Sequence, residues 1–169
     1  MEFAKRKHPR LKAYDYSQDG CYFVTLCTEN KLPLLSRINR SQSPIEDTII
    51  NLTAIGHIIE GELLSLPNRY PNVSINKYVI MPTHLHVIIR LDGNMMNDSI
   101  HPTLMDIICA FKSITTRLSN QRDHVTGRKI WQTSFYEKVI RDDKSHEALW
   151  KYIESNPIKW EEDEYYIPF

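Results

Sequence analysis

The chain has 169 residues, with 21 Lys and Arg against 21 Asp and Glu, so its formal net charge is zero. Hydrophobic residues make up 41% and charged residues 25%, a globular composition that argues against a disordered chain or a strongly basic, histone-like binder. The length predicts a single domain over residues 1–169. No run approaches the roughly 20 apolar residues of a spanning helix, which predicts no membrane association. Three cysteines without metal-ligand spacing predict a reducing, cytoplasmic compartment.

The charges are concentrated at the two ends. An N-terminal arm over residues 1–15 is basic, and a tail over residues 160–169 is acidic and aromatic. The arm contains the basic residues Lys5, Arg6, Lys7, Arg10 and Lys12. Such an arm can neutralise phosphates of a nucleic acid or can simply be a solvated tail.

Along the chain, the first expected element is a strand at residues 21–28, which are rich in β-branched and aromatic residues. Residues 32–50 contain two prolines and fit a short hairpin. Helical periodicity then predicts a helix over residues 51–66, closed by Pro67. Residues 73–81 and 84–91 read as a β-hairpin in the middle of a sheet, since only Pro82 and Thr83 separate them.

The second half of the chain again alternates helices with a strand. An apolar stripe predicts a helix over 102–120, residues 134–141 suggest a strand, and a last helix runs over 145–156 before Pro157. The order of elements is that of the α+β ferredoxin-like split β-α-β fold, with an antiparallel sheet, helices packed on one face and an extra C-terminal helix.

His84 and His86 are the first candidates for chemistry. They are two residues apart on a predicted strand, so both imidazoles point to the same face. Two imidazoles side by side are a natural pair of ligands for a divalent ion. The same spacing also suits two half-buried, hydrogen-bonded histidines.

The last helix offers Tyr152 and Asn156, which are four residues apart and therefore share a face. A carboxamide oxygen is an acceptable ligand for Mg²⁺ or Mn²⁺, and a phenol one turn away is a potential nucleophile. From the helix alone, Tyr152 equally suits a core aromatic and Asn156 a C-terminal cap.

Five segments, in this order along the chain, resemble one known family. They are RLKAYDYSQDGCYFVTLCT, YVIMPTHLHVII, AFKSITTRL, IWQTSFYEKVIRDD and YIESNPIKW. With these segments the chain resembles the single-tyrosine HUH transposases of the insertion-sequence type, and among them the REP-associated tyrosine transposases. The HUH motif itself corresponds to His84, Leu85 and His86. Two departures are Thr83 and Lys138, where many relatives have asparagine and histidine.

The resemblance implies an endonuclease and strand-transfer activity on single-stranded DNA. Tyr152, on the helix after the sheet, would be the nucleophile that forms a covalent 5′-phosphotyrosine. His84, His86 and Asn156 would bind the divalent metal ion, Mg²⁺ or Mn²⁺. Tyr136 is the alternative nucleophile, although it falls on a predicted strand and the residue four positions later is Ile140, which cannot bind metal.

The expected partner is single-stranded DNA, folded as a hairpin in family precedent, and a homodimer is possible. Candidate phosphate contacts outside the arm are Lys112, Arg117, Arg128 and Lys129, each equally suited to being a solvated charge. Three alternatives stay open: a domesticated or inactive sequence-specific DNA-binding protein on the same fold, a metal-dependent hydrolase in which water is the nucleophile, and a plain interaction domain.

Overall fold

The computed structural model describes residues 19–39, 48–93, 102–166 and 168. Over these residues the strands are β1 (Gly20–Cys27), β2 (Ser36–Asn39), β3 (Ile49–Leu52), β4 (Val73–Ile80), β5 (His84–Leu91) and β6 (Tyr136–Ile140). The α-helices are α1 (Ala54–Leu64), α2 (Leu66–Arg69), α3 (Leu104–Arg122) and α4 (Asp143–Ser155). Short 3₁₀ helices lie at Glu29–Lys31 (η1) and Trp160–Glu162 (η3).

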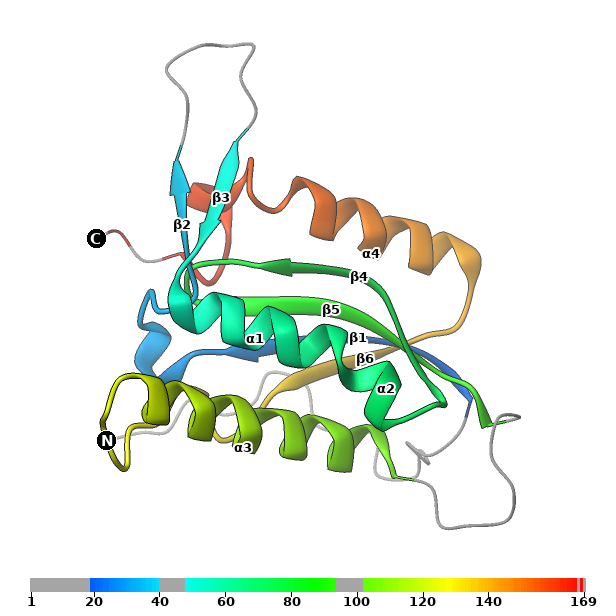
Figure 1. Cartoon of the computed structure of the whole chain (residues 1–169). Helices are drawn as coiled ribbons and strands as arrows, with labels where there is room; N and C mark the ends of the chain where they lie inside the picture. The colour runs from blue at the N-terminus through cyan, green and yellow to red at the C-terminus, as the bar shows by residue number, and fades with distance from the viewer. Residues whose placement is uncertain (1–18, 40–47, 94–101, 167, 169) are drawn as a thin grey trace.

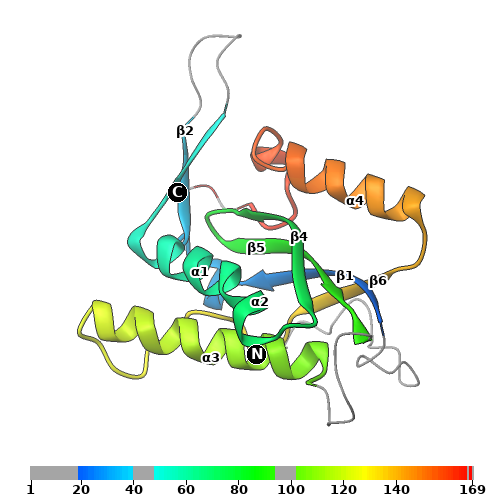
Figure 2. The same cartoon turned by 45° about the vertical axis from the view of Figure 1, so that its right-hand side comes forward.

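Four strands form one antiparallel sheet in the order β4-β5-β1-β6, and β2 and β3 form a separate hairpin. Helices α1 and α3 pack on one face of the sheet, and α4 lies across the other (Figure 1). The rotated view shows the same three layers (Figure 2). This arrangement confirms the expected ferredoxin-like α+β fold with an additional C-terminal helix.

Strand alternation divides the core into two layers. In β5, Leu85, Val87 and Ile89 belong to the larger core cluster, which α1 and α3 cover. Ile88 belongs to the smaller cluster beneath α4, together with Phe23 of β1. Because successive side chains point to opposite faces, the parity that buries Leu85 and Val87 under α1 and α3 places His84 and His86 on the α4 face.

Hydrogen-bonding side chains set the beginnings of the long helices. Thr103 accepts a hydrogen bond from the backbone N–H of Asp106, whose carboxylate accepts one from Thr103 N–H, forming a capping box at α3. Asp142 accepts a hydrogen bond from the N–H of Ser145 and caps α4. The last helix therefore begins at Asp143, two residues before the sequence pattern indicates.

Three expectations about the elements were wrong in detail. Residues 51 and 52 belong to β3, and α1 begins after Thr53, whose hydroxyl accepts from Gly56 N–H. Pro67 opens the short helix α2 rather than simply closing α1, because a proline needs no hydrogen-bond acceptor in a first turn. The hairpin of β4 and β5 is not in the middle of the sheet, since β4 is an edge strand.

The basic residues of the N-terminal arm, Lys5, Arg6, Lys7, Arg10 and Lys12, lie outside the described residues. In the part of the chain that is described, no helix has both the length and the apolarity needed to cross a membrane.

Two glycines on α1 provide a matched test of this packing. A Cβ atom added to Gly56 would lie 2.0 Å from the carbonyl oxygen of Leu35, whereas one added to Gly61 would meet nothing within 4 Å. We expect Gly56→Ala to lower the free energy of unfolding by about 2 kcal/mol, because backbone must move. Gly61→Ala should raise it by about 0.5 kcal/mol through helix propensity. Urea denaturation checks both, and equal effects of the two substitutions would contradict the described packing.

Candidate metal and nucleophile site

Both histidines of the HUH motif are buried at the start of β5, with 0% and 1% of His84 and His86 exposed. Their rings are 4.4 Å apart between centroids. Nδ1 of His86 is hydrogen-bonded to the Thr25 hydroxyl at 2.8 Å, and Nδ1 of His84 lies 3.3 Å from the Thr83 hydroxyl. These contacts orient the Nε2 atoms of both rings toward α4 and the C-terminal segment.

Helix α4 brings Tyr152 and Asn156 to the histidines. The phenol oxygen of Tyr152 lies 3.4 Å from Nε2 of His86, and the two rings are 5.2 Å apart between centroids. The side chain of Tyr152 is 39% exposed, whereas that of Asn156 is 3% exposed. The candidate nucleophile can therefore be reached from solvent, while the amide is enclosed beside the imidazoles.

The C-terminal segment contributes Asp163, which directly follows η3. One carboxylate oxygen accepts a hydrogen bond from Nδ2 of Asn156 at 2.6 Å, and the other accepts one from Tyr165 N–H at 2.7 Å. The Asn156 amide group donates its N–H to Asp163, so its oxygen is the atom left to act as a ligand.

His84, His86 and Asp163 each offer one ligand atom, and these atoms all lie within 4.8 Å of one another. Nε2 of His84 and Oδ1 of Asn156 are buried and have no hydrogen-bond partner among the described residues. Buried polar atoms are rarely left unpaired, and imidazole nitrogen, carboxylate and amide oxygens are all ligands of divalent ions. The donor set therefore fits a metal ion.

Burial controls protonation in this cluster. It lowers the pKa of His84 from 6.5 to about 4, against the opposing effects of Asp163 and of the neighbouring Asn156 amide. Burial, and then the proximity of His84, lowers the pKa of His86 well below its ordinary range. Both imidazoles are thus neutral at pH 7, which is the form that binds metal. Burial, followed by the charges of Asp163 and Glu164, raises the pKa of Tyr152 to about 12.

Aromatic residues of the C-terminal segment also pack against the histidines. The ring of Tyr165 lies 4.7 Å from that of His84 between centroids, and the ring of Trp160 lies 5.9 Å from it. The Thr83 hydroxyl donates to the Tyr165 carbonyl at 3.0 Å, and Lys31 Nζ donates to the Glu164 carbonyl at 3.1 Å. The departure at Thr83 therefore has a structural role, because its hydroxyl anchors this segment.

Tyr136, the alternative nucleophile, is the first residue of β6. It is aligned with Thr25 of β1, which is in turn aligned with His86, so two strand spacings separate it from His86. That separation is about 10 Å. Its ring packs edge-on against Phe23. The geometry places Tyr152, and not Tyr136, beside the histidines.

Two of the candidate phosphate contacts make internal hydrogen bonds. Lys112 donates to the carbonyls of Gln132 and Thr133 at 2.7 and 2.8 Å. Arg128 pairs with Asp123 at 2.7 Å and donates to the Ser119 carbonyl. The other two, Arg117 and Lys129, are exposed. Lys112 and Arg117 lie on α3, across the sheet from the histidines.

Sequence reasoning missed Thr25, Asp163 and Tyr165. Asp163 is one of four consecutive acidic residues, and an acidic run is typical of a solvated segment. The available signal was the large aromatics on either side of that run, Trp160 and Tyr165, which indicate a packed segment.

The ferredoxin-like sheet thus brings paired histidines on one strand next to a tyrosine and an asparagine on a following helix. The family of IS200-like transposases matches residues 68–156, a range that includes both histidines, Tyr152 and Asn156. The chain belongs to this family.

Comparisons with individual proteins agree with this assignment. An uncharacterized protein of Haemophilus influenzae is 31% identical over 96% of this chain and 93% of its own length. A REP-associated tyrosine transposase of Escherichia coli K12 is 27% identical over 85% of this chain and 70% of its own length. A solved structure of a REP-associated tyrosine transposase bound to a REP hairpin has a TM-score of 0.52, at 22% identity over 87% of this chain and 72% of that chain. The fold is therefore shared with that protein.

Proposed function

We propose that this protein cleaves and rejoins single-stranded DNA through a covalent 5′-phosphotyrosine at Tyr152. The observation that carries the proposal is the convergence of the Tyr152 phenol, 3.4 Å from His86, with two buried ligand atoms that lack partners among the described residues. A tyrosine that served only the core would not need to stand half exposed over such a cluster.

The residues proposed to hold a divalent ion, Mg²⁺ or Mn²⁺, are His84 and His86 through their imidazoles, Asn156 through its amide oxygen and Asp163 through its carboxylate. When bound, such an ion would polarise the scissile phosphate and favour the ionised form of the neighbouring phenol. The pKa of Tyr152, raised to about 12, explains why this nucleophile needs activation.

The chemical step is a transesterification. The Tyr152 oxygen attacks phosphorus, its proton leaves to solvent, and the bond from phosphorus to the 3′ oxygen breaks. The products are a 5′-phosphotyrosine and a free 3′-hydroxyl. Attack by another 3′-hydroxyl reverses the reaction and joins strands, with one phosphoester exchanged for another, so no external energy source is needed.

The substrate we propose is a DNA hairpin with an adjoining single strand. The support is a related transposase whose solved structure contains a REP hairpin. A chain whose formal net charge is zero, with its 7 histidines counted as neutral, has no overall electrostatic attraction to DNA. Contacts with the phosphates must therefore come from local basic groups. The basic arm, Arg117 and Lys129 remain candidates for those contacts.

The metal site can be tested without DNA. We expect His86→Ala and Asp163→Asn each to weaken Mn²⁺ binding about tenfold or more, because each removes a ligand or the charge that supports one. Isothermal titration calorimetry measures the affinity. Glu162→Gln, in the same acidic run, is the matched control and should bind as the wild type does. Unchanged affinity in both site variants would rule out this cluster as the metal site.

The nucleophile can be tested by covalent capture. Tyr152→Phe should abolish the protein–DNA adduct on a hairpin oligonucleotide in the presence of Mg²⁺ or Mn²⁺, because the attacking oxygen is gone. Denaturing gels detect the adduct, and circular dichroism confirms folding. Tyr136→Phe is the control and should keep the adduct. An adduct that persists in Tyr152→Phe and vanishes in Tyr136→Phe would overturn the assignment.

Hairpin preference gives a separate test. We expect tighter binding of a hairpin with a flanking strand than of a random linear strand of equal length, and a steep loss of affinity between 50 and 200 mM salt, by about tenfold or more, if several phosphates are contacted. Fluorescence anisotropy on the Tyr152→Phe variant measures both. Equal affinity for the two DNAs would contradict hairpin recognition.

A further inference from the structure

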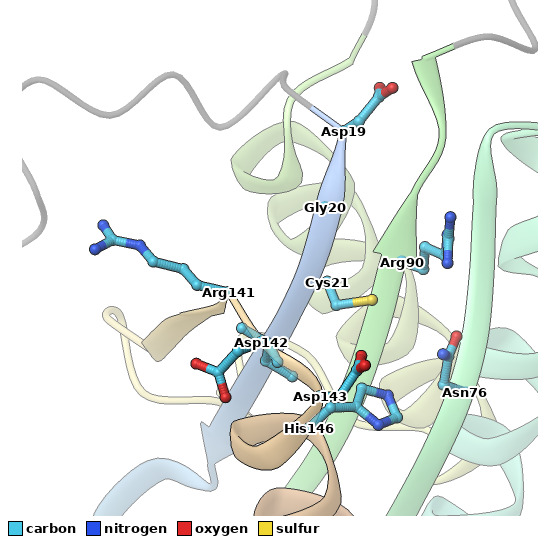
Figure 3. A pocket seen from close by; sticks show the side chains of 10 residues that line it. Asp19, Gly20, Cys21, Asn76, Arg90, Arg141, Asp142, Asp143 and His146 are labelled. Carbon is cyan, nitrogen blue, oxygen red and sulfur yellow. The ribbon is translucent and has the colours of Figure 1, made fainter.

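A pocket lies on the α4 face of the sheet, at the opposite end of β5 from the histidines. Its volume is about 490 Å³, within the range of pockets that enclose small organic ligands, about 300–1,000 Å³. Figure 3 shows Asn76, Arg90, Cys21 and His146 around this hollow, whereas Arg141 extends away from it at the rim. The pocket draws on all four strands of the main sheet and on the first turn of α4.

Strand alternation directs Asn76 to this face, next to a break in the pairing of β4 with β5. Ile75 pairs with Ile89 and Lys77 pairs with Ile88, so Asn76 is an extra residue with no partner on β5. Ile75 and Tyr78, on either side of the bulge, both pack against the larger core. Asn76 follows Ile75 and so points to the α4 face by ordinary alternation, which places its carboxamide beside the pocket. The bulge brings Lys77 to the same face, where it pairs with Glu154 of α4.

Arg90 provides the positive charge. It lies on β5, four residues after His86 and hence on the same face of the sheet. Its side chain is exposed, and within the described ranges its guanidinium makes no hydrogen bond or ion pair. A guanidinium with free donors at the mouth of a pocket suits a phosphate or the acceptor edge of a base.

The helix side of the pocket is His146. It shares the inner face of α4 with Leu149, Ile153 and Asn156, which follow at helical spacing. Its ring lies 5.9 Å from that of Trp150 between centroids. An aromatic ring at this position offers a stacking surface for a nucleobase.

Acidic residues also line the pocket, and they limit what it can bind. Asp142 is already engaged by Ser145, whose N–H and hydroxyl it accepts at 2.7 and 3.0 Å. Asp143 stands beside His146. Carboxylates repel a bare phosphate but accept hydrogen bonds from the amino groups of bases. The lining therefore suits a nucleotide, with its base inside and its phosphate toward Arg90, better than a free anion.

The pocket lies at a defined distance from the nucleophile. His146 precedes Tyr152 by six residues, a rise of about 9 Å along a helix. Arg90 follows His86 by four residues, about 13 Å along a strand. Because stacked nucleotides advance about 3.4 Å each, the distance from the pocket to Tyr152 and His86 spans on the order of three nucleotides.

We propose that this pocket binds one nucleotide of the DNA strand, about three nucleotides from the phosphate that Tyr152 attacks, and so helps to select where the strand is cut. The proposal rests on the proposed function, since it assigns a specificity subsite to the same DNA strand.

An abasic scan tests the proposal by binding alone. In the Tyr152→Phe background, a single abasic site is moved along the strand of a hairpin oligonucleotide, and fluorescence anisotropy gives each affinity. We expect one position about three nucleotides from the cut to lose roughly tenfold in affinity. Asn76→Ala and Arg90→Gln should weaken the intact DNA about equally and remove the penalty of that abasic site.

Arg69→Gln is the matched control, because Arg69 belongs to α2, which packs on the opposite face of the sheet. It should keep the abasic profile of its parent. A profile that is unchanged in Asn76→Ala and Arg90→Gln would overturn the subsite.

Cys21 offers a readout that does not depend on mutation. It is a free, half-buried cysteine that lines the pocket, whereas the free and exposed Cys109 on α3 lies across the sheet. Bound DNA should slow alkylation of Cys21 by iodoacetamide severalfold and leave Cys109 unchanged, as followed by mass spectrometry. Unchanged alkylation of Cys21 under saturating DNA would contradict the proposal.

The two proposals fail differently. Suppose that no covalent adduct forms, but one abasic position loses affinity and bound DNA protects Cys21. That result would refute Tyr152 chemistry and support the subsite. Suppose instead that an adduct forms at Tyr152, but the pocket variants remove no abasic penalty. That result would support the chemistry and refute the subsite.

Discussion

Two imidazoles buried side by side impose the main constraint on this molecule. His84 and His86 lie between the sheet and α4, and polar rings so placed are costly unless every nitrogen has a partner. Threonines on β1 and in the preceding turn face the Nδ1 atoms. The Nε2 atoms face Tyr152, Asn156 and Asp163. Nε2 of His84 and Oδ1 of Asn156 are buried here without a hydrogen-bond partner among the described residues.

The rest of the fold serves that placement. The parity of β5 decides that the histidines face α4, and the apolar side chains on its other face lock that parity into the larger core. The Asp142 cap sets where α4 begins, and hence which residues of α4 reach the histidines. The C-terminal segment then crosses back, with Tyr165 over His84 and Asp163 bound to Asn156. Removing the C-terminal segment or shifting α4 would leave buried polar atoms of the site without hydrogen-bond partners.

Local patterns in the sequence predict much of this structure. The strand at β1, the pairing of β4 with β5 and the stripes of α3 follow from periodicity, and the residues His84, His86, Tyr152 and Asn156 follow from spacing and family resemblance. What local patterns cannot supply are contacts between distant segments. Asp163 accepts a hydrogen bond from Asn156 only because η3 turns the chain back toward α4. Arg128 forms an ion pair with Asp123 because the turn after α3 brings the two together. The bulge at Asn76 likewise depends on how β5 is aligned with β4.

In the proposed reaction Tyr152 carries the DNA strand. The most direct measurement is to digest the covalent complex with protease and nuclease and to locate the remaining nucleotide by mass spectrometry. We expect a 5′-phosphonucleotide on the peptide that contains Tyr152, and none without a divalent ion. A nucleotide on the peptide that contains Tyr136, or nicked DNA with no attached peptide, would contradict it.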